Sequence, residues 1–288
     1  MITPPCSTMN PPVQQRPGLG IIGMGLMGGA LMRMTGAARG WDIDPARCVH
    51  AGSAAEVFAN CAVVMLCLPD SHIASAVLAA AETRPGQIIV DTTTGDPGVM
   101  AALGAALAEK GCHYLDATIS GSSVQLLRRD VLVMAGGDAD VVERCREIFD
   151  TFASEVIHAG PCGAGARMKL VTNLVLGLNR AALAEGLAFA EALGVEPESA
   201  LRAMRAGNAY SRAMDVKGEK MIRRDYTPQA RLSQHLKDLR LMQNCAGERG
   251  MDLPLARTHR ALLEKAEGMG LGSLDNSAIL EVLRLHRE

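Results

Sequence analysis

The stretch GLGIIGMGLMGGAL, residues 18–31, decides the fold of the first half of the chain. The apolar run LGII leads into three glycines spaced as GxGxxG, and a helical pattern follows. In that context the first glycine permits a tight turn, the second lets a pyrophosphate approach the backbone, and the third lets helix and strand pack closely. The helix start also offers free N–H groups to phosphates. We therefore expect a dinucleotide to contact Gly23, Met24, Gly25, Leu26, Met27 and Gly28; the alternative is a glycine-rich turn without a ligand.

An acidic residue about 20 positions after the first glycine can bind the adenosine ribose. The segment RGWDIDP supplies Asp42, which lies 19 residues after Gly23, and also Asp44. A regular second strand is hard to find here, and both acids could instead begin a turn before Pro45. We favour Asp42 as the ribose ligand. Because a carboxylate repels the 2′-phosphate of NADP, we expect NAD as the cofactor, with NADP less favoured.

The two halves of the chain differ in their hydrophobic patterns. Before Gly160, helical stretches alternate with the continuously apolar runs CAVVMLCLP, QIIVDTTT, HYLDATIS and VLVMAGG. Such runs are typical of strands buried on both faces, and their order predicts an α/β fold with a parallel sheet. Beyond Gly163 helical periodicity dominates, and we expect helices near 163–193, 196–206, 211–223, 231–249, 254–268 and 275–286. The predicted parts are a disordered tail over 1–17, a dinucleotide-binding domain over 18–162 and an all-helical domain over 163–288.

The composition excludes several classes of function. The net charge is −2, so nothing indicates a nucleic-acid or membrane surface. The eight cysteines form no CxxC pair and no Cys/His cluster at zinc spacing, which argues for reduced thiols, a cytoplasmic location and no metal site. The first 17 residues hold five prolines and no apolar run, so they do not read as a secretory signal. No apolar run reaches the length of a membrane span.

Two strand ends are further candidates for cofactor contact. Ligands bind outside the carboxyl ends of parallel strands, where Leu68-Pro69 ends one run and Thr92, Thr93 and Thr94 end another. The threonines could equally cap the following helix.

Lys169 and Asn173 share one face of the long helix that begins with GAGARMKLVTN, residues 163–173. A lysine in a cleft loses proton affinity through desolvation, which suits a proton donor to a carbonyl oxygen or an acceptor from an alcohol. The alternative is a lysine that extends its ammonium to water. The helix is also apolar around much of its circumference, so we expect a homodimer or homotetramer that buries it.

Four segments together resemble motifs of the β-hydroxyacid dehydrogenase family, which includes 3-hydroxyisobutyrate dehydrogenase and tartronate semialdehyde reductase. They are GMGLMGGALM at 23–32, DATISGSS at 116–123, GAGARMKLVTN at 163–173 and LKDLRL at 236–241. The resemblance covers about residues 19–280. It implies a Rossmann-type doubly wound sheet joined by a long helix to an all-α C-terminal domain.

The resemblance also implies roles for residues of this chain. Lys169 would be the general acid or base, and Asn173 would bind the substrate and hold Lys169 in place. The family's imine-reducing relatives lack this lysine. The substrate carboxylate would be held by Ser120 and Gly121, with Ser122 nearby. Further cofactor contacts would come from Leu68, Pro69, Thr94 and Lys237.

Departures from the family pattern fall around the expected substrate. Thr118 replaces a proline, Ser122 and Ser123 replace glycines, and Ala230 stands where an aromatic residue is frequent. Near the ribose, Ile43 stands where NADP-preferring members carry an arginine.

We therefore expect an NAD-linked, 3-hydroxyisobutyrate dehydrogenase-like oxidoreductase acting on a small β-hydroxy acid or its semialdehyde. The alternative is a non-catalytic dinucleotide-sensing or scaffold protein on the same fold.

Overall fold

The computed structural model describes residues 14–284 and divides the chain into two compact units. Residues up to Thr93 together with Gly98–Gly165 form the first unit, and Thr94–Pro97 together with the chain from Ala166 form the second. The tail predicted over 1–17 lies mostly outside the described residues, and its last two residues, Arg16 and Pro17, belong to the first strand.

The first unit contains a seven-stranded sheet in the order β2-β1-β3-β4-β5-β6-β7. Strand β1 lies between β2 and β3, so the chain changes direction across the sheet beside β1. Such a switch point is where ligands bind in open α/β sheets. Fully buried side chains such as Ile21, Met65, Val90 and Leu115 form the core on these strands. The strands are β1 (Arg16–Ile22), β2 (Ala37–Trp41), β3 (Val63–Leu66), β4 (Ile88–Asp91), β5 (His113–Ser120), β6 (Leu132–Gly136) and β7 (Glu155–Gly160).

The predicted parallel sheet is confirmed for β1–β5, and the departure from it lies at β6, which pairs antiparallel with β5. The segment between them holds only the short helix α5 (Ser123–Leu127). A parallel pairing would need a crossover of a dozen or more residues, which carries the chain back to the end where β5 begins. The chain instead turns back at the end where β5 finishes. Strand β7 pairs parallel with β6, so both strands run opposite to β5.

The two edge strands, β2 and β7, carry no continuous apolar run. Strand β2 contains Arg39 and Gly40, and most side chains of β7 are partly or fully exposed. Because an edge strand is not buried on both faces, the pattern that indicated the central strands is missing from both. The sequence showed no regular second strand, yet β2 forms and ends directly before Asp42.

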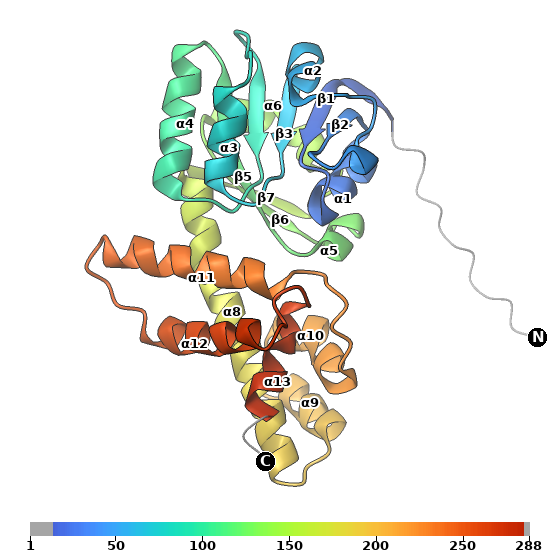
Figure 1. Cartoon of the computed structure of the whole chain (residues 1–288), viewed down its shortest axis with the longest axis vertical. Coiled ribbons are helices and arrows are strands. Elements are labelled where there is room, and N and C mark those ends of the chain that lie inside the picture. The colour runs from blue at the N-terminus through green and yellow to red at the C-terminus, as the bar shows by residue number, and fades with distance from the viewer. Residues whose placement is uncertain (1–13, 285–288) are drawn as a thin grey trace, which may run out of the picture. The chain divides into compact units, whose positions relative to one another are not determined.

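Helices cover both faces of the sheet. Right-handed crossovers place α2, α3 and α4 on one face and α1, α6 and α7 on the other. Helices α3 and α4 lie in front of the strands in Figure 1. The helices are α1 (Leu26–Thr35), α2 (Ala54–Asn60), α3 (Ser71–Ala79), α4 (Pro97–Glu109), α6 (Ala139–Arg144) and α7 (Arg146–Phe149), with a 3-10 turn η1 (Pro45–Arg47).

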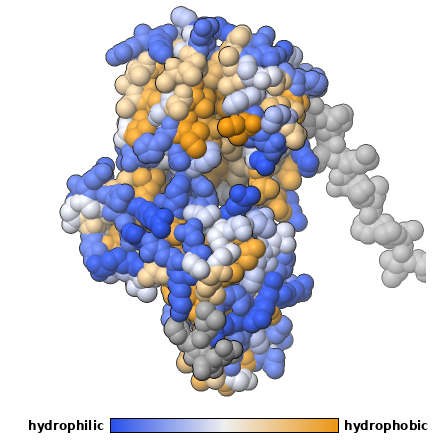
Figure 2. Space-filling model, viewed as in Figure 1, coloured by the Kyte–Doolittle hydropathy of each residue, from blue (hydrophilic) through white to orange (hydrophobic). Residues whose placement is uncertain are grey.

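The second unit is helical, and the predicted helices near 163–193, 196–206, 211–223, 231–249 and 254–268 are confirmed to within two residues at each end. In place of the helix predicted near 275–286, a 3-10 turn precedes an α-helix that begins at Ile279, and the predicted end lies outside the described residues. The long helix α8 (Ala164–Ala192), drawn in yellow in Figure 1, packs its buried leucines, Leu183 and Leu187, into the core of this unit. The visible faces of α11 and α12 are mostly hydrophilic (Figure 2). The remaining elements are α9 (Pro197–Ala206), α10 (Arg212–Arg223), α11 (Leu232–Gly247), α12 (Pro254–Gly268), η2 (Asn276–Ala278) and α13 (Ile279–Arg284).

The first turn of α8 is held tightly against β5 and β6. The backbone N–H of Gly163 donates to Asp116 Oδ1 at 2.8 Å, and the Thr118 hydroxyl donates to the Gly165 carbonyl at 3.1 Å. A Cβ at Gly165 would lie 2.2 Å from the Asp116 carbonyl oxygen, so only glycine fits. Thr118 is fully buried. We expected the threonine that replaces proline here to lie near the substrate. In the structure its hydroxyl instead binds the first turn of α8.

Candidate active site

The glycine turn follows β1 and precedes α1, and its three glycines serve two purposes. Gly23 has a φ of +94°, and a Cβ there would lie 2.3 Å from the Cys67 carbonyl oxygen. A Cβ at Gly28 would lie 1.8 Å from the Gly23 carbonyl oxygen. A Cβ at Gly25 would meet nothing within 4 Å. Gly23 and Gly28 are therefore required by the turn itself, whereas Gly25 faces open space that a ligand can use.

The N-terminus of α1 is not capped by the protein. Gly25 is the N-cap residue, it has no side chain to accept a hydrogen bond, and the first turn contains no acidic residue. The positive end of a ten-residue helix is thus left available. Together with the space beside Gly25, this arrangement fits the pyrophosphate of a dinucleotide.

Asp42 lies at the glycine turn, as expected of the ribose ligand. Its Oδ2 accepts a hydrogen bond from the backbone N–H of Met24 at 2.7 Å, and its Oδ1 accepts one from the N–H of Asp44 at 2.9 Å. The carboxylate of Asp44 is used locally, because it caps the turn η1 through Ala46 and pairs with Arg47 at 3.1 Å. Of the two acids, Asp42 is therefore the one that the fold places beside the cofactor turn.

Leu68 joins this group from the end of β3. Its Cδ2 atom would lie 3.2 Å from a Cβ at Gly23, and its backbone N–H donates to the Thr93 hydroxyl at 3.2 Å. The Thr92 hydroxyl donates to the Leu66 carbonyl at 2.7 Å. Thr92 and Thr93 therefore fasten the ends of β3 and β4 together. Pro69 follows Leu68 before helix α3.

The residues expected at the substrate carboxylate, Ser120, Gly121 and Ser122, follow one another at the end of β5. Gly121 has a φ of +143°, and a Cβ there would lie 2.5 Å from Val131 Cγ1. Ser122 is the N-cap of α5, where its hydroxyl accepts from the N–H of Gln125 and its own N–H donates to Gln125 Oε1 at 3.0 Å. The hydroxyl and N–H of Ser122 are thus already engaged, whereas Ser120 and Gly121 are partly exposed.

Lys169 and Asn173 lie in the second unit on one face of α8, and both side chains are buried. The Lys169 side chain is 7% exposed. This burial lowers the pKa of Lys169 to about 8, while the carboxylate of Asp238 acts in the opposite direction. The ammonium and the neutral amine are therefore both accessible near neutral pH.

Asp238 on α11 connects the polar residues of this unit. Asn173 Nδ2 donates to its Oδ2 at 3.3 Å, and Lys237 Nζ lies 3.2 Å from its Oδ1. Lys237 Nζ also donates to the Thr94 carbonyl at 2.9 Å. Burial raises the pKa of Asp238, whereas Lys237 and Lys169 favour its charged form. Asp238 thus contacts Asn173 and Lys237 directly and acts electrostatically on Lys169, while Thr94 is linked to it through Lys237.

No role was predicted for Asp238 from the sequence. Its only signal was its place in the segment LKDLRL, directly after Lys237. The glycine turn, Asp42, Leu68 and the serines belong to the first unit, whereas Lys169, Asn173, Lys237 and Thr94 belong to the second. Among residues 14–284 no group of three or more His, Cys, Asp or Glu side chains could hold a metal ion. No helix of that range is long and apolar enough to cross a membrane.

Known proteins resemble the chain over most of its length. Residues 18–160 match a family model described as the NAD binding domain of 6-phosphogluconate dehydrogenase. Residues 163–283 match one described as the NAD-binding of NADP-dependent 3-hydroxyisobutyrate dehydrogenase.

Individual relatives align with both units. The chain is 29% identical to 2-hydroxy-3-oxopropionate reductase of Escherichia coli, over 77% of this chain and 78% of that protein. It is 28% identical to L-threonate dehydrogenase of Cupriavidus necator, over 92% of this chain and 95% of that one. The crystal structure of a 3-hydroxyisobutyrate dehydrogenase from Salmonella typhimurium superposes with a TM-score of 0.82 at 26% identity, covering 92% of this chain and 99% of that chain.

Alanine substitutions in the glycine turn should separate its two purposes. We predict that Gly25→Ala weakens NADH binding by about tenfold or more, since a methyl group placed against a pyrophosphate costs about 1–3 kcal/mol. The free energy of unfolding of the Gly25→Ala variant should differ from that of the wild type by less than about 1 kcal/mol. Gly28→Ala should lose both stability and binding. Gly29→Ala adds the same methyl group with its nearest neighbour 4.0 Å away and is the control. Fluorescence titration with NADH and thermal unfolding measure both effects, and unaltered NADH binding by Gly25→Ala would contradict the assignment.

Proposed function

Because the chain belongs to the β-hydroxyacid dehydrogenase family, we propose that it is an NAD-dependent oxidoreductase that interconverts a small β-hydroxy acid and its semialdehyde. The relatives that it matches include 2-hydroxy-3-oxopropionate reductase, L-threonate dehydrogenase and 3-hydroxyisobutyrate dehydrogenase. The observation that carries the proposal is a buried lysine whose pKa is lowered to about 8, with a carboxylate and an amide beside it.

A bound nicotinamide dinucleotide supplies or accepts the hydride, and the residues of the first unit fit that cofactor. The uncapped start of α1 and the space at Gly25 suit the pyrophosphate, and Asp42 suits the ribose hydroxyls. In this proposal residues 18–162 bind the cofactor, and Leu68, Pro69 and Thr94 of this range contact it. Lys237 provides a further contact.

Lys169 supplies the proton of the proposed reaction. During reduction its ammonium donates a proton to the substrate's carbonyl oxygen, and during oxidation its neutral amine accepts the proton of the alcohol. A pKa near 8 keeps both forms accessible at neutral pH. Asp238 holds Asn173 and stabilises the ammonium, so that Lys169 is not driven to the neutral form by burial alone.

The substrate's carboxylate is assigned to the end of β5. Ser120 and the backbone of Gly121 are partly exposed there and can donate hydrogen bonds to it. Ser122 contributes through its reciprocal cap with Gln125, which fixes the backbone that follows Gly121.

Replacement of Lys169 tests the proposed reaction. Lys169→Ala should lower turnover of C3–C4 semialdehydes by about two to four orders of magnitude, which is the usual contribution of a general acid. NADH binding should remain, because the glycine turn is untouched. The exposed Lys110 is the control site, and Lys110→Ala should keep full turnover. Near-normal turnover by Lys169→Ala would refute the role assigned to Lys169. No turnover of any such substrate by the wild type would favour the non-catalytic alternative.

The pH dependence of turnover should follow the pKa of Lys169. Reduction needs the ammonium, so the turnover number for reduction should be level below about pH 8 and fall as pH rises through that value. Oxidation needs the neutral amine and should show the opposite dependence. Steady-state rates measured in both directions with one substrate pair check this, and parallel pH profiles would argue against Lys169.

Cofactor preference tests the role of Asp42. We expect a higher kcat/KM with NADH than with NADPH, because Asp42 repels a 2′-phosphate and the nearby Arg47 is already paired with Asp44. Asp42→Asn combined with Ile43→Arg should shift the preference toward NADPH, whereas Asp140→Asn, which changes an exposed carboxylate on α6, should leave it unchanged. A wild-type preference for NADPH above tenfold would mean that more than about 1.4 kcal/mol favours the phosphate, and would refute the assignment.

The exposed side of α8 supports self-association. Met168, Val171, Val175, Phe189 and Leu193 follow one side of the helix and are exposed, with Phe189 at 62% and Leu193 at 64%. An apolar stripe of this length is typical of a protein interface. We propose a homodimer or homotetramer in which α8 is covered by a second copy.

Light scattering at micromolar concentration measures this assembly. Val175→Asp should shift the protein toward the monomer, because it places a charge in the apolar interface. Leu255→Asp is the control, because Leu255 is as exposed but lies on α12. A monomeric wild type would overturn the proposed assembly.

A further inference from the structure

Arg180 is a buried cation without a partner in the second unit. It lies on the same face of α8 as Lys169 and Asn173, and it is 4% exposed. Its Nε and Nη2 atoms have no hydrogen-bond partner, and it forms no ion pair within the part of the chain that the structure describes. A buried charge that lacks a partner is strongly destabilising, so this guanidinium requires an explanation.

Two buried histidines from other helices lie in its electrostatic surroundings. His235 of α11 and His259 of α12 have ring centroids 5.2 Å apart and planes tilted by 45°. Gly177 of α8 leaves room for them, since a Cβ there would lie 2.4 Å from His235 Nε2 and 3.0 Å from His259 Cε1. His235 Nε2 and both ring nitrogens of His259 have no hydrogen-bond partner among the described residues. Three helices thus bring unsatisfied nitrogen atoms together.

The acids nearest in electrostatic reach are already engaged. Asp275 accepts two hydrogen bonds from Lys217 at 2.9 Å and another from the backbone of Gln229, and it also binds Ser277. Asp238 is held by Asn173 and Lys237. These two carboxylates act on Arg180 from a distance but bind other cations directly, and among the described residues neither forms an ion pair with Arg180.

The protonation states leave a net positive charge. Burial lowers the pKa of Arg180 only to about 10, so the guanidinium stays charged at neutral pH. Burial and the charge of Arg180 lower the pKa of both histidines, so the imidazoles are neutral and each offers one N–H donor. Water molecules can satisfy these donors, but they cannot balance the charge.

We propose that Arg180, His235 and His259 form a buried binding site for a small monovalent anion, either a halide ion or the carboxylate of a small acid. The guanidinium supplies the charge and two N–H donors, and the imidazoles supply the remaining N–H groups. Arg180 itself is distant from Lys169, because it follows Lys169 by eleven residues, about 16 Å along the helix axis, whereas His235 lies within the electrostatic reach of both. The proposal does not depend on the reaction assigned to Lys169.

Thermal unfolding in different sodium salts at equal ionic strength tests the site. Chloride and acetate are the two probes, and 2-(N-morpholino)ethanesulfonate is the reference anion, which is too large for a closed site. We expect the Tm of the wild type to rise by roughly 2–3 °C at an anion concentration tenfold above Kd. A rise with chloride identifies a halide site, and a rise with acetate but not with chloride identifies a carboxylate site.

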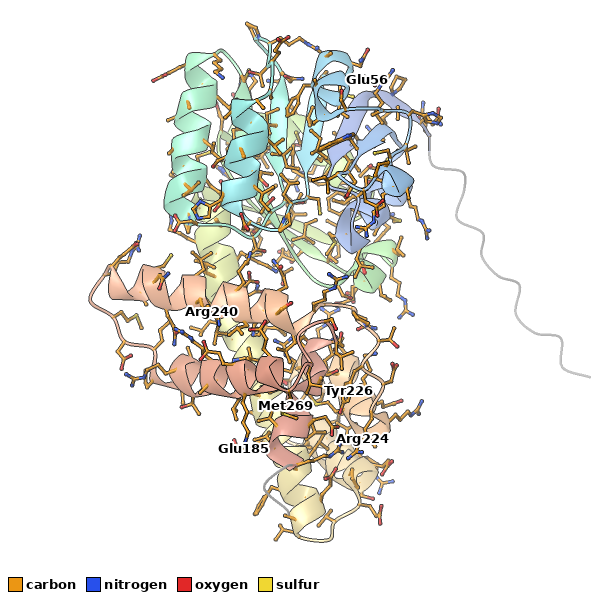
Figure 3. All side chains as sticks on the ribbon, viewed as in Figure 1. Glu56, Glu185, Arg224, Tyr226, Arg240 and Met269 are labelled. Carbon is orange, nitrogen blue, oxygen red and sulfur yellow. The ribbon has the colours of Figure 1, made fainter. Side chains whose placement is uncertain are left out.

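Two variants separate binding from general salt effects. Arg180→Met removes the charge and should abolish the difference between the probe salts and the reference salt. Arg240→Met is the matched control, because Arg240 lies on the exposed side of α11, pairs with Glu264 at 3.1 Å and is labelled in Figure 3. It should keep the full rise. The proposal is overturned if the wild type unfolds at the same temperature in all three salts, or if Arg180→Met keeps the full rise.

A crystallographic experiment on the wild type needs no variant to fold. Crystals of the full chain soaked in sodium bromide, and others in sodium bromoacetate, should show an anomalous bromine peak in contact with the Arg180 guanidinium in at least one soak. A peak in the bromide soak supports the halide form, and one in the bromoacetate soak supports the carboxylate form. Absence of a peak at Arg180 in both soaks overturns the proposal.

Discussion

The buried carboxylate of Asp238 is the interaction on which the polar part of the second unit depends. At 5% exposure it is costly to keep charged, and burial raises its pKa, whereas Lys237, Lys169 and the hydrogen bond from Asn173 favour its charged form. In return it opposes the loss of proton affinity that burial imposes on Lys169. Removing one partner from such a buried arrangement costs about 3–5 kcal/mol, so these side chains form a single unit.

The first unit prepares its part of the chemistry by different physical means. Its cofactor turn is built from backbone geometry, in which Gly23 and Gly28 avoid clashes of 2.3 and 1.8 Å and Gly25 leaves space. Charge enters only through the helix end and through Asp42, whose carboxylate is held by the N–H of Met24. In the proposed function, binding of the dinucleotide is therefore mainly a matter of shape, whereas proton transfer by Lys169 is a matter of burial and charge.

The two faces of helix α8 differ in their side chains. Lys169, Asn173, Gly177 and Arg180 share the inward face, where each polar group must find a partner or a ligand. The outward face carries the exposed apolar stripe that includes Phe189. A helix of this composition gave a weak amphipathic signal, because both faces contain apolar residues and the buried face also holds charges. Its polar residues are intelligible only through the helices that pack against them.

Local constraints explain what the sequence by itself determined. The glycine turn, the buried central strands, the helices of the second unit and the pairing of Lys169 with Asn173 each depend on residues close together in the chain. The edge strands β2 and β7 escaped prediction because one-sided burial leaves no apolar run, and the reversed direction of β6 followed from the short connection after β5. Only the tertiary structure decided the role of Asp238, because its partner Asn173 lies 65 residues away. It also decided the isolation of Arg180, since the presence or absence of a counter-charge depends on every helix that surrounds it.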